Sequence, residues 1–222
     1  MIVKRFVVFE GIDGAGTSTQ IEILKKNPLA KNFFFTAEPS DGATGIFLRK
    51  ILAGNAEVSP ESAAYLFAAD RAEHLWGKGG ILEQTESGKI VVCDRYIFSS
   101  LAYQGATCGE SLPKTINSPF PLPEILFFFG IGAEDSISRI ERRGQKREIY
   151  ESHDMLAKTA ERYKKIVSEY KSQNEMKIVE LDATLSKERI AEQIWICLEP
   201  LLREKNSPQV EKKTCHNFQT GL

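Results

Sequence analysis

Five short runs of mainly apolar residues recur along the chain, separated by longer segments with the spacing of amphipathic helices. Continuous apolar runs, unlike alternating ones, are typical of strands that are covered on both faces. The runs are residues 6–9, 33–36, 90–93, 125–129 and 177–181. The helical segments are residues 19–26, 44–53, 60–76, 97–106, 133–142, 153–170 and 187–203. This alternation predicts an α/β fold of three layers, α/β/α, with a five-stranded parallel sheet and with ligands at the carboxyl ends of the strands.

The charge balance and the cysteines restrict the class of protein. Lys and Arg number 29 and Asp and Glu 30, so the net charge of −1 argues against a nucleic-acid binder. The four cysteines (Cys93, Cys108, Cys197 and Cys215) form no Cys-x-x-Cys pair, and scattered thiols are typical of a reducing compartment. No charge-free run reaches the roughly 18 residues that a membrane helix needs. We therefore expect a cytoplasmic protein that binds neither nucleic acid nor membrane.

A glycine-rich turn follows the first predicted strand and opens a helix. Residues 11–20 read GIDGAGTSTQ and fit the phosphate-loop pattern G-x-x-x-x-G-K-[ST] at Gly11, Gly16 and Ser18. The glycines let successive backbone N–H groups converge on one anion, and the helix N-terminus adds further donors. Ser18 has the position whose hydroxyl binds Mg²⁺. A plain strand-to-helix turn is the alternative, but the predicted strand and helix around the motif favour phosphate binding.

The lysine of this pattern is replaced by Thr17. That lysine is a point charge that bridges two phosphates during transfer. Loss of one charge-assisted donor at a transition state costs on the order of 3 kcal/mol, roughly a hundredfold in rate, unless another cation substitutes. Thr17 donates a hydrogen bond but carries no charge, so a replacement cation has to come from elsewhere in the chain.

A second cluster, DRYIFSSLAYQG, spans residues 94–105. Asp94 ends a predicted buried strand, where its carboxylate would face the phosphate loop and hold Mg²⁺ directly or through water. Arg95 offers a planar fork of donors that suits a second, acceptor phosphate. The alternative is an aspartate cap at a helix N-terminus beside a solvated arginine.

Three further segments have less specific patterns. Phe67 and Arg71 are four residues apart, so they share a helix face, yet spacing alone favours a core phenylalanine and a surface arginine. His74 is a lone histidine with no predicted role. Five basic residues fall within positions 139–147, which indicates either a cationic flap over phosphates or a solvated helix end. Residues 117–123 are proline-rich and predict a plain loop.

Taken together, these motifs resemble the thymidylate kinase family, P-loop nucleoside monophosphate kinases that phosphorylate dTMP. The resemblance covers about residues 1–202 and rests on FEGIDGAG, TAEP, LFAADRA, DRY with YQG, and LDA, in that order along the chain. It replaces the interpretation of Phe67 and Arg71 as a core residue and a surface residue with one in which both belong to a binding site. A single domain over residues 1–206, with a lid at about 142–151 and a tail at 207–222, is expected.

The resemblance implies a role for each motif position. The ATP phosphates would lie against Gly11, Ile12, Asp13, Gly14, Ala15, Gly16, Thr17, Ser18 and Thr19, while Ser18 and Asp94 would serve Mg²⁺. The dTMP site would be formed by Glu38, Pro39, Arg49, Phe67, Arg71, Arg95, Ser99, Ser100, Tyr103 and Gln104. Asp13, Arg95, Arg142, Arg143 and Arg147 would be the catalytic residues. The family also implies a homodimer.

Within the dTMP site, Phe67 would stack on thymine and Arg71 would bind its edge. Arg95 would hold the phosphate, assisted by Arg49 and the turn at Glu38, and Tyr103 would crowd the 2′ position. Asp13 would face the 3′-hydroxyl or the phosphate. The phosphate loop has no arginine, so lid cations, including Lys146, would have to supply the catalytic charge.

Three positions depart from the family pattern: Thr17, Ala37 in place of an arginine, and Gly130 in place of an aspartate. The first two remove positive charge near phosphates. The leading hypothesis is Mg²⁺-dependent transfer of the γ-phosphoryl group of ATP to dTMP. The alternatives are a weakened or inactive nucleotide-binding homologue, because of Thr17, and a kinase for a related deoxynucleotide.

Overall fold

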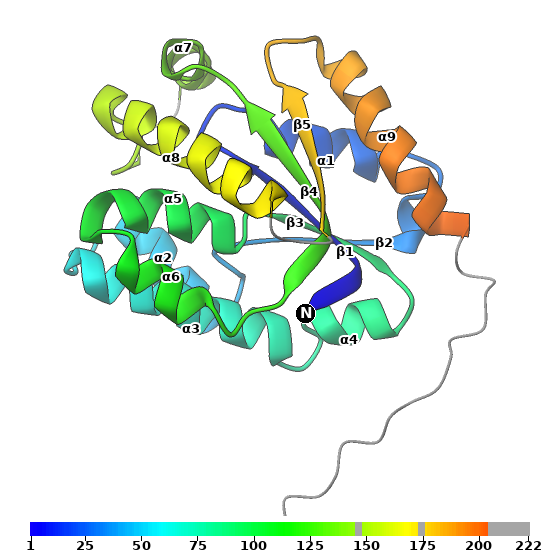
Figure 1. The fold of residues 1–222 in the computed structure, drawn as a ribbon, viewed down its shortest axis with the longest axis horizontal. Helices are drawn as coiled ribbons and strands as arrows, with labels where there is room; N and C mark the ends of the chain where they lie inside the picture. Colours follow the sequence, from blue (N-terminus) through cyan, green and yellow to red (C-terminus); the bar gives the residue numbers. More distant parts are fainter. Residues whose placement is uncertain (145–147, 173–175, 204–222) are drawn as a thin grey trace, which may run out of the picture.

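The computed structural model describes residues 1–144, 148–172 and 176–203. Its centre is a five-stranded sheet of order β2-β3-β1-β4-β5 in which every pair is parallel (Figure 1). The strands are β1 (Ile2–Gly11), β2 (Phe33–Ala37), β3 (Ile90–Asp94), β4 (Leu122–Gly130) and β5 (Lys177–Asp182). The predicted fold class is confirmed, and all five strands lie where the apolar runs predicted them.

Helices cover both faces of the sheet. Alternate residues of the strands point to opposite faces, so Val7 and Phe9 pack against one helix layer while Phe6 and Val8 pack against the other. The first layer holds α1 (Thr17–Lys25) and α9 (Lys187–Arg203), which lie together in Figure 1. The second layer contains α3 (Pro60–Trp76), α4 (Ile81–Glu86), α5 (Ile97–Cys108), α7 (Ala133–Arg143) and α8 (His153–Lys171). The remaining helices are α2 (Ala43–Leu52), α6 (Ser111–Asn117) and the short 3₁₀ helix Ala30–Asn32.

Some predicted boundaries were wrong. β1 and β4 are longer than their apolar runs, because the first residues of β1 pair with those of β4 across an irregular register between Val3 and Val7. The two shortest α-helices, α4 and α6, were missed, because six or seven residues are too few to reveal a helical period.

The plain loop predicted at residues 117–123 was also wrong in part. Asn117 is the last residue of α6, and β4 begins at Leu122. Pro113 is compatible with the helix because it lies in the first turn, where a missing N–H breaks no helical hydrogen bond.

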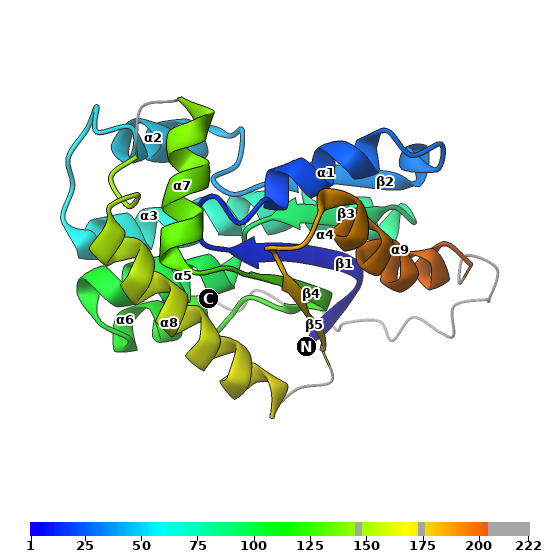
Figure 2. The same ribbon diagram turned by 90° about the horizontal axis from the view of Figure 1, so that it is seen from above.

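The carboxyl ends of the strands meet at one edge of the sheet. Seen from above, the arrow of β1 points to the side of the molecule on which α2 and α7 lie (Figure 2). None of the helices in the described part of the chain is both long and apolar enough to cross a bilayer.

Candidate active site

A cavity of about 830 Å³ opens at this edge of the sheet. Its walls come from the turn after β1, the turn after β2, α3, the beginning of α5 and residues 148–150 of the predicted lid. Most of the predicted site residues line it: Ile12, Asp13, Gly14, Ala15, Gly16, Thr17, Ser18, Thr19, Glu38, Pro39, Arg49, Phe67, Arg71, Asp94, Arg95, Ser99, Ser100, Tyr103 and Gln104. Segments that are far apart in sequence therefore contribute to one site.

The glycine-rich turn has the geometry that its sequence requires. Gly14 and Gly16 have φ angles of 80° and 98°, a left-handed conformation that L side chains rarely adopt. A Cβ at Gly11 would lie 2.9 Å from the carbonyl oxygen of Phe129, so this strand end requires glycine as well. Gly11 itself is not part of the cavity wall. Thr17, which stands in the lysine position, is buried as the first residue of α1.

Two oxygen donors lie beside this loop. The Ser18 hydroxyl donates a hydrogen bond of 2.7 Å to Oδ2 of Asp94. Oδ1 of Asp94 is buried and has no hydrogen-bond partner among the described residues. An orphaned carboxylate oxygen next to a hydroxyl fits a hard divalent cation, which prefers oxygen ligands. Ser18 and Asp94 could therefore hold Mg²⁺.

Arg95 lies between the phosphate loop and α5. Its guanidinium donates to the carbonyl oxygen of Gly11 at 2.9 Å and to Oδ1 of Asp13 at 2.5 Å. Oδ2 of Asp13 accepts a hydrogen bond of 2.9 Å from the Tyr103 hydroxyl. The guanidinium also lies 5.4 Å from the centre of the Tyr103 ring. Arg95 is thus held in the cavity from three directions with its positive charge close to the loop.

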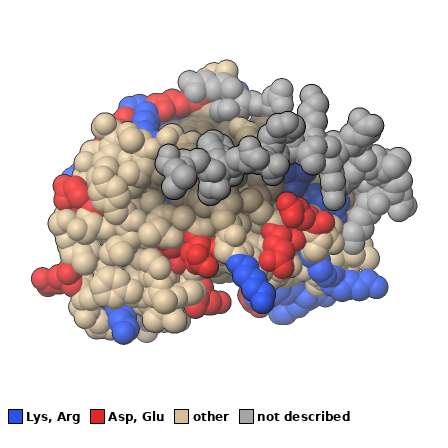
Figure 3. Space-filling view, turned by 90° about the horizontal axis from the view of Figure 1, so that it is seen from below, with Lys and Arg blue, Asp and Glu red and all other residues tan. Residues whose placement is uncertain are grey.

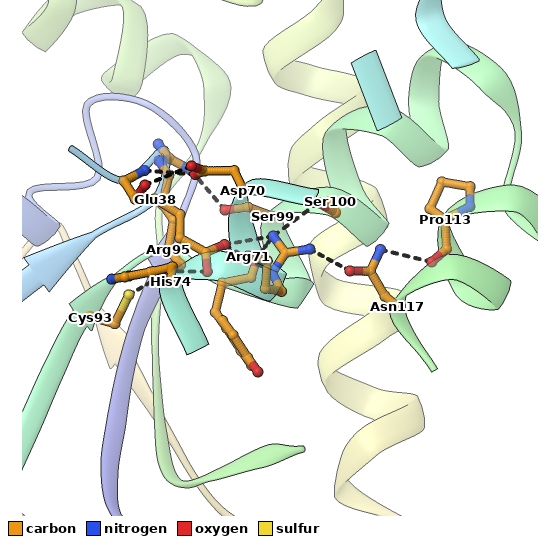
Figure 4. A network of polar contacts seen from close by, with 12 residues as sticks. Glu38, Asp70, Arg71, His74, Cys93, Arg95, Ser99, Ser100, Pro113 and Asn117 are labelled. Carbon is orange, nitrogen blue, oxygen red and sulfur yellow. Dashed lines mark hydrogen bonds and ion pairs between the residues drawn. The ribbon is translucent and has the colours of Figure 1, made fainter. Parts of the chain in front are cut away.

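Arg71 is buried, with 1% of its surface exposed, although its spacing alone indicated a surface residue. Figure 4 shows its guanidinium between Glu38 and Asn117. Nε and Nη2 contact Oε2 of Glu38 at 2.9 and 2.7 Å, and Nη1 donates to Oδ1 of Asn117. Nη2 also reaches the carbonyl oxygen of Tyr96 and the Ser100 hydroxyl. These contacts fix the guanidinium plane at the cavity wall.

His74, which had no predicted role, belongs to the same network. One ring nitrogen lies 2.6 Å from the Thr36 hydroxyl. The other lies 3.3 Å from Oε1 of Glu38, which is beside His74 in Figure 4. The ring thereby links the end of β2 to the carboxylate that pairs with Arg71. Sequence reasoning missed this because the partners of His74 are 36 and 38 residues away in the chain.

The turn after β2 is held from two sides. Arg49 donates to the carbonyl oxygens of Ser40 at 2.5 Å and Pro39 at 2.6 Å. Asp70 of α3 accepts from the Ser40 backbone N–H and hydroxyl at 2.7 and 2.6 Å. The arginine and the turn that the resemblance paired therefore lie in contact.

Of the cations predicted to be catalytic in the lid, the structure describes the side chain of Arg142 alone. Arg142 is exposed, donates to Ser138, and does not line the cavity. The side chain of Arg143, together with Lys146 and Arg147, lies outside the described residues, as does the 207–222 tail. Glu148 and Tyr150 of the lid do line the cavity.

Arg139 is a cation that the predicted site omitted. It lines the cavity and donates to the carbonyl oxygens of Gly14 at 3.3 Å and Ala183 at 2.6 Å. Lys187, at the start of α9, also lines the cavity. The signal for Arg139 was in the sequence, since it is the first of the five basic residues in the 139–147 cluster.

Residues 148–151 contact the opposite side of the cavity. The backbone N–H of Ile149 donates to the carbonyl oxygen of Leu52, the last residue of α2, at 3.1 Å. The Tyr150 ring lies 5.6 Å from that of Tyr103. This part of the lid therefore rests on elements that carry the predicted dTMP site.

Comparison with known proteins gives one consistent result. The profile of the family described as Thymidylate kinase matches residues 9–194. "Putative thymidylate kinase" of Treponema pallidum is 43% identical over 195 residues, 87% of this chain and 94% of that protein. "Probable thymidylate kinase" of Methanocaldococcus jannaschii is 38% identical over 77% of this chain and 85% of its own length. "Probable thymidylate kinase" of Pyrococcus abyssi is 38% identical over 85% of this chain and 93% of its own length.

Proposed function

Because this chain belongs to the thymidylate kinase family, we propose that the cavity at the carboxyl ends of its strands carries the family's reaction. The protein transfers the γ-phosphoryl group of ATP to dTMP and releases dTDP and ADP. The relatives do not support the alternative of an inactive homologue, despite Thr17. The observation that carries the site assignment is that the glycine-rich loop, Arg95 and Arg71 line one cavity.

On the acceptor side, thymine would lie against Phe67 with its edge at Arg71. Ser99, Ser100 and Gln104 would line the base pocket, and Tyr103 would exclude a 2′-hydroxyl. The dTMP phosphate would bind to Arg95, whose planar guanidinium offers a fork of in-plane N–H donors suited to phosphate. Arg49 would complete the pocket by holding the turn that contains Glu38 and Pro39. Asp13 would complete it on the side of the loop.

On the donor side, the backbone of residues 11–19 would bind the ATP phosphates, as a glycine-rich loop at a helix N-terminus does. Ser18 and Asp94 would hold Mg²⁺, which when bound neutralises charge on the phosphates. Arg142, Arg143, Lys146 and Arg147 of the lid, with Arg139, would supply the positive charge that Thr17 lacks.

The reaction requires positioning and charge neutralisation more than covalent catalysis. An oxygen of the dTMP phosphate attacks the γ-phosphorus, a new P–O bond forms, and the bond from that phosphorus to the β-phosphate oxygen breaks. ADP leaves with that oxygen. Arg95, whose guanidinium is paired with Asp13, would hold the attacking phosphate in line, and the lid would exclude water.

A coupled assay of ADP release tests this assignment. ATP is supplied with Mg²⁺ and with each nucleoside monophosphate in turn, and turnover is expected to be highest with dTMP. Omission of Mg²⁺ is expected to abolish turnover. Turnover that is equal for dTMP and dCMP would contradict the proposed base pocket, and turnover without a divalent cation would contradict the roles of Ser18 and Asp94.

We also propose that the protein is a homodimer in the cytoplasm, with one domain over residues 1–206. Helices α2 and α3 expose four large apolar side chains: Ile46, Phe47, Tyr65 and Trp76. Figure 3 looks onto the side on which α3 and α6 lie, and uncharged side chains predominate there, away from the grey atoms. Sedimentation of the wild type and of a Phe47→Asp, Tyr65→Asp variant tests this, with a dimer and a monomer expected respectively.

A further inference from the structure

Glu10 is a buried carboxylate at the carboxyl end of β1, and the mechanism above gives it no role. Its surface is completely buried. Oε1 accepts backbone N–H bonds from Tyr96 at 2.7 Å and Ser99 at 3.1 Å. Oε2 accepts hydroxyl bonds from Ser99 and Tyr163, both at 2.7 Å. A buried charge of this kind is costly unless every oxygen is bonded, and here both oxygens have two donors.

The backbone that Glu10 binds is the strained turn before α5. Arg95 has a φ angle of 72°, a left-handed conformation that is unfavourable for a long side chain. The next residue, Tyr96, is the N-cap of α5, and no side chain within that turn caps the helix. Glu10 supplies the missing acceptor from a neighbouring strand, immediately after the strained residue.

A second contact reaches the guanidinium itself. Nη1 of Arg95 lies 3.3 Å from the Ser99 hydroxyl oxygen, and that hydroxyl in turn donates to Glu10. Tyr163 comes from α8, so the same carboxylate joins the helix after the lid to the start of α5. Glu10 therefore contacts the backbone that follows Arg95. It also contacts the Ser99 side chain, which in turn contacts the Arg95 guanidinium.

We propose that Glu10 is a positioning residue for dTMP: its ionised carboxylate holds the turn before α5 so that Arg95 faces the acceptor phosphate. This inference rests on the proposed role of Arg95. It assigns to the glutamate no contact with either nucleotide. The effect on dTMP is transmitted through Tyr96, Ser99 and the guanidinium of Arg95.

A glutamine would not reproduce these contacts. Four donors converge on Glu10, and only the ionised carboxylate accepts from all of them, whereas the NH₂ group of a glutamine would donate to the Ser99 and Tyr163 hydroxyls and leave their protons to find other acceptors. Burial raises the pKa of Glu10 to about 7, although the bonds from Ser99 and Tyr163 and the charge of Arg95 oppose this shift. Besides Arg95, the titratable groups that interact with Glu10 are Tyr163 and Cys93.

The chain contains a matched control at the other end of the same sheet. Arg5 is the second non-glycine residue with positive φ among the described residues, at 63°, and its backbone N–H donates to Glu124 at 2.6 Å. Glu124 lies in β4 and does not line the cavity. Glu124→Gln thus removes a carboxylate from a strained arginine without touching the nucleotide site.

The test compares Glu10→Gln, Glu124→Gln, Arg95→Ala and the double variant of Glu10 and Arg95 by steady-state kinetics. Glu10→Gln is expected to raise KM for dTMP about tenfold while kcat and KM for ATP change less than about twofold. In the Arg95→Ala background the same change is expected to have less than about a twofold effect. Glu124→Gln is expected to leave all three constants unchanged.

The pH profile gives an independent readout. For the wild type, kcat/KM for dTMP is expected to rise through pH 7 relative to the profile of Glu10→Gln, because protonation of Glu10 removes an acceptor. If Glu10→Gln does not fold, Tyr163→Phe is used, with about a threefold rise in KM for dTMP expected from loss of one donor.

Three results would overturn the inference: an unchanged KM for dTMP in Glu10→Gln, an equal effect in the presence and absence of Arg95, or an equal effect from Glu124→Gln. Failure of the proposed function has a different signature. In that case Arg95→Ala itself would leave KM and kcat for dTMP unchanged.

Discussion

The two halves of the cavity are built in different ways. On the acceptor side, Arg71 and Arg95 are each tied to a carboxylate and to further oxygens from other elements. On the donor side, the loop has Thr17 in place of a lysine, and Arg142 is exposed on α7. The difference indicates that the proposed acceptor pocket is organised by buried polar contacts before a ligand arrives. Among the described residues, the cations proposed to serve ATP are Arg139, which lines the cavity, and Arg142, which does not.

Among the variants that test the difference between the two halves, Arg95→Ala should have the largest effect. We expect kcat/KM for dTMP to fall about a thousandfold, because a charge-assisted fork to phosphate is lost and Asp13 loses its ion-pair partner. The ATP affinity, measured by titration calorimetry, should change less than about threefold. Equal losses for both nucleotides would show that the two halves are not separately organised.

Arg71→Ala should reveal how much the acceptor side depends on its buried charges. We expect the free energy of unfolding to fall by about 3 kcal/mol, because the Glu38 carboxylate, 3% exposed, would remain buried without its partner. Chemical denaturation measures this, and Arg142→Ala on the exposed donor side is the control, with a change below about 0.5 kcal/mol. Similar losses in both variants would remove the distinction between buried and peripheral cations.

The pH dependence of stability sharpens the comparison at Glu10. Its pKa is raised by burial from 4.5 to about 7, so the folded state binds the proton more tightly than the unfolded state. This group therefore lowers the free energy of unfolding as pH rises from 4.5 through 7, by about 3 kcal/mol in total. Glu10→Gln lacks that titration, so the wild type should lose about this much relative to the variant between pH 4.5 and pH 8. A constant difference across this range would contradict a buried, titrating Glu10.

Arg139→Ala should have the smallest effect and should act on the donor side alone. Arg139 contacts the backbone of Gly14 in the phosphate loop, so we expect KM for ATP to rise about tenfold with little change in KM for dTMP. Lys158→Ala on α8, an exposed residue that does not line the cavity, is the control. A rise in KM for dTMP alone would show that Arg139 acts on the acceptor side and would contradict its assignment to the donor side.

Most of the fold could be predicted because its signals are local. Each strand contains a short run of mainly apolar residues, and Gly11 and Gly16 mark the loop before α1 in the sequence itself. The two elements missed, α4 and α6, are too short for their periodicity to be read. The residues proposed for the acceptor side came from the resemblance, and the structure brings them to one cavity.

What the sequence could not predict is how those residues are held. Arg71 appears as a surface residue by spacing, because nothing local indicates Asn117, 46 positions away, or Glu38, 33 positions away. Glu10 stands next to an apolar run, and its donors are 86 to 153 positions away. Contacts over such separations arise only when the sheet brings the strand ends together.

The contact of Ile149 with Leu52 has a consequence for the order of events during turnover. One backbone hydrogen bond and the Tyr150–Tyr103 ring contact join residues 149 and 150 to the acceptor side. A hydrogen bond between Tyr150 and Gln104 adds a third contact, and each of the three contributes about 0.5–1.5 kcal/mol. Contacts of this size can break and re-form singly without unfolding of α2 or α5, so passage of a nucleotide between residues 149–150 and the acceptor side requires no helix to unfold.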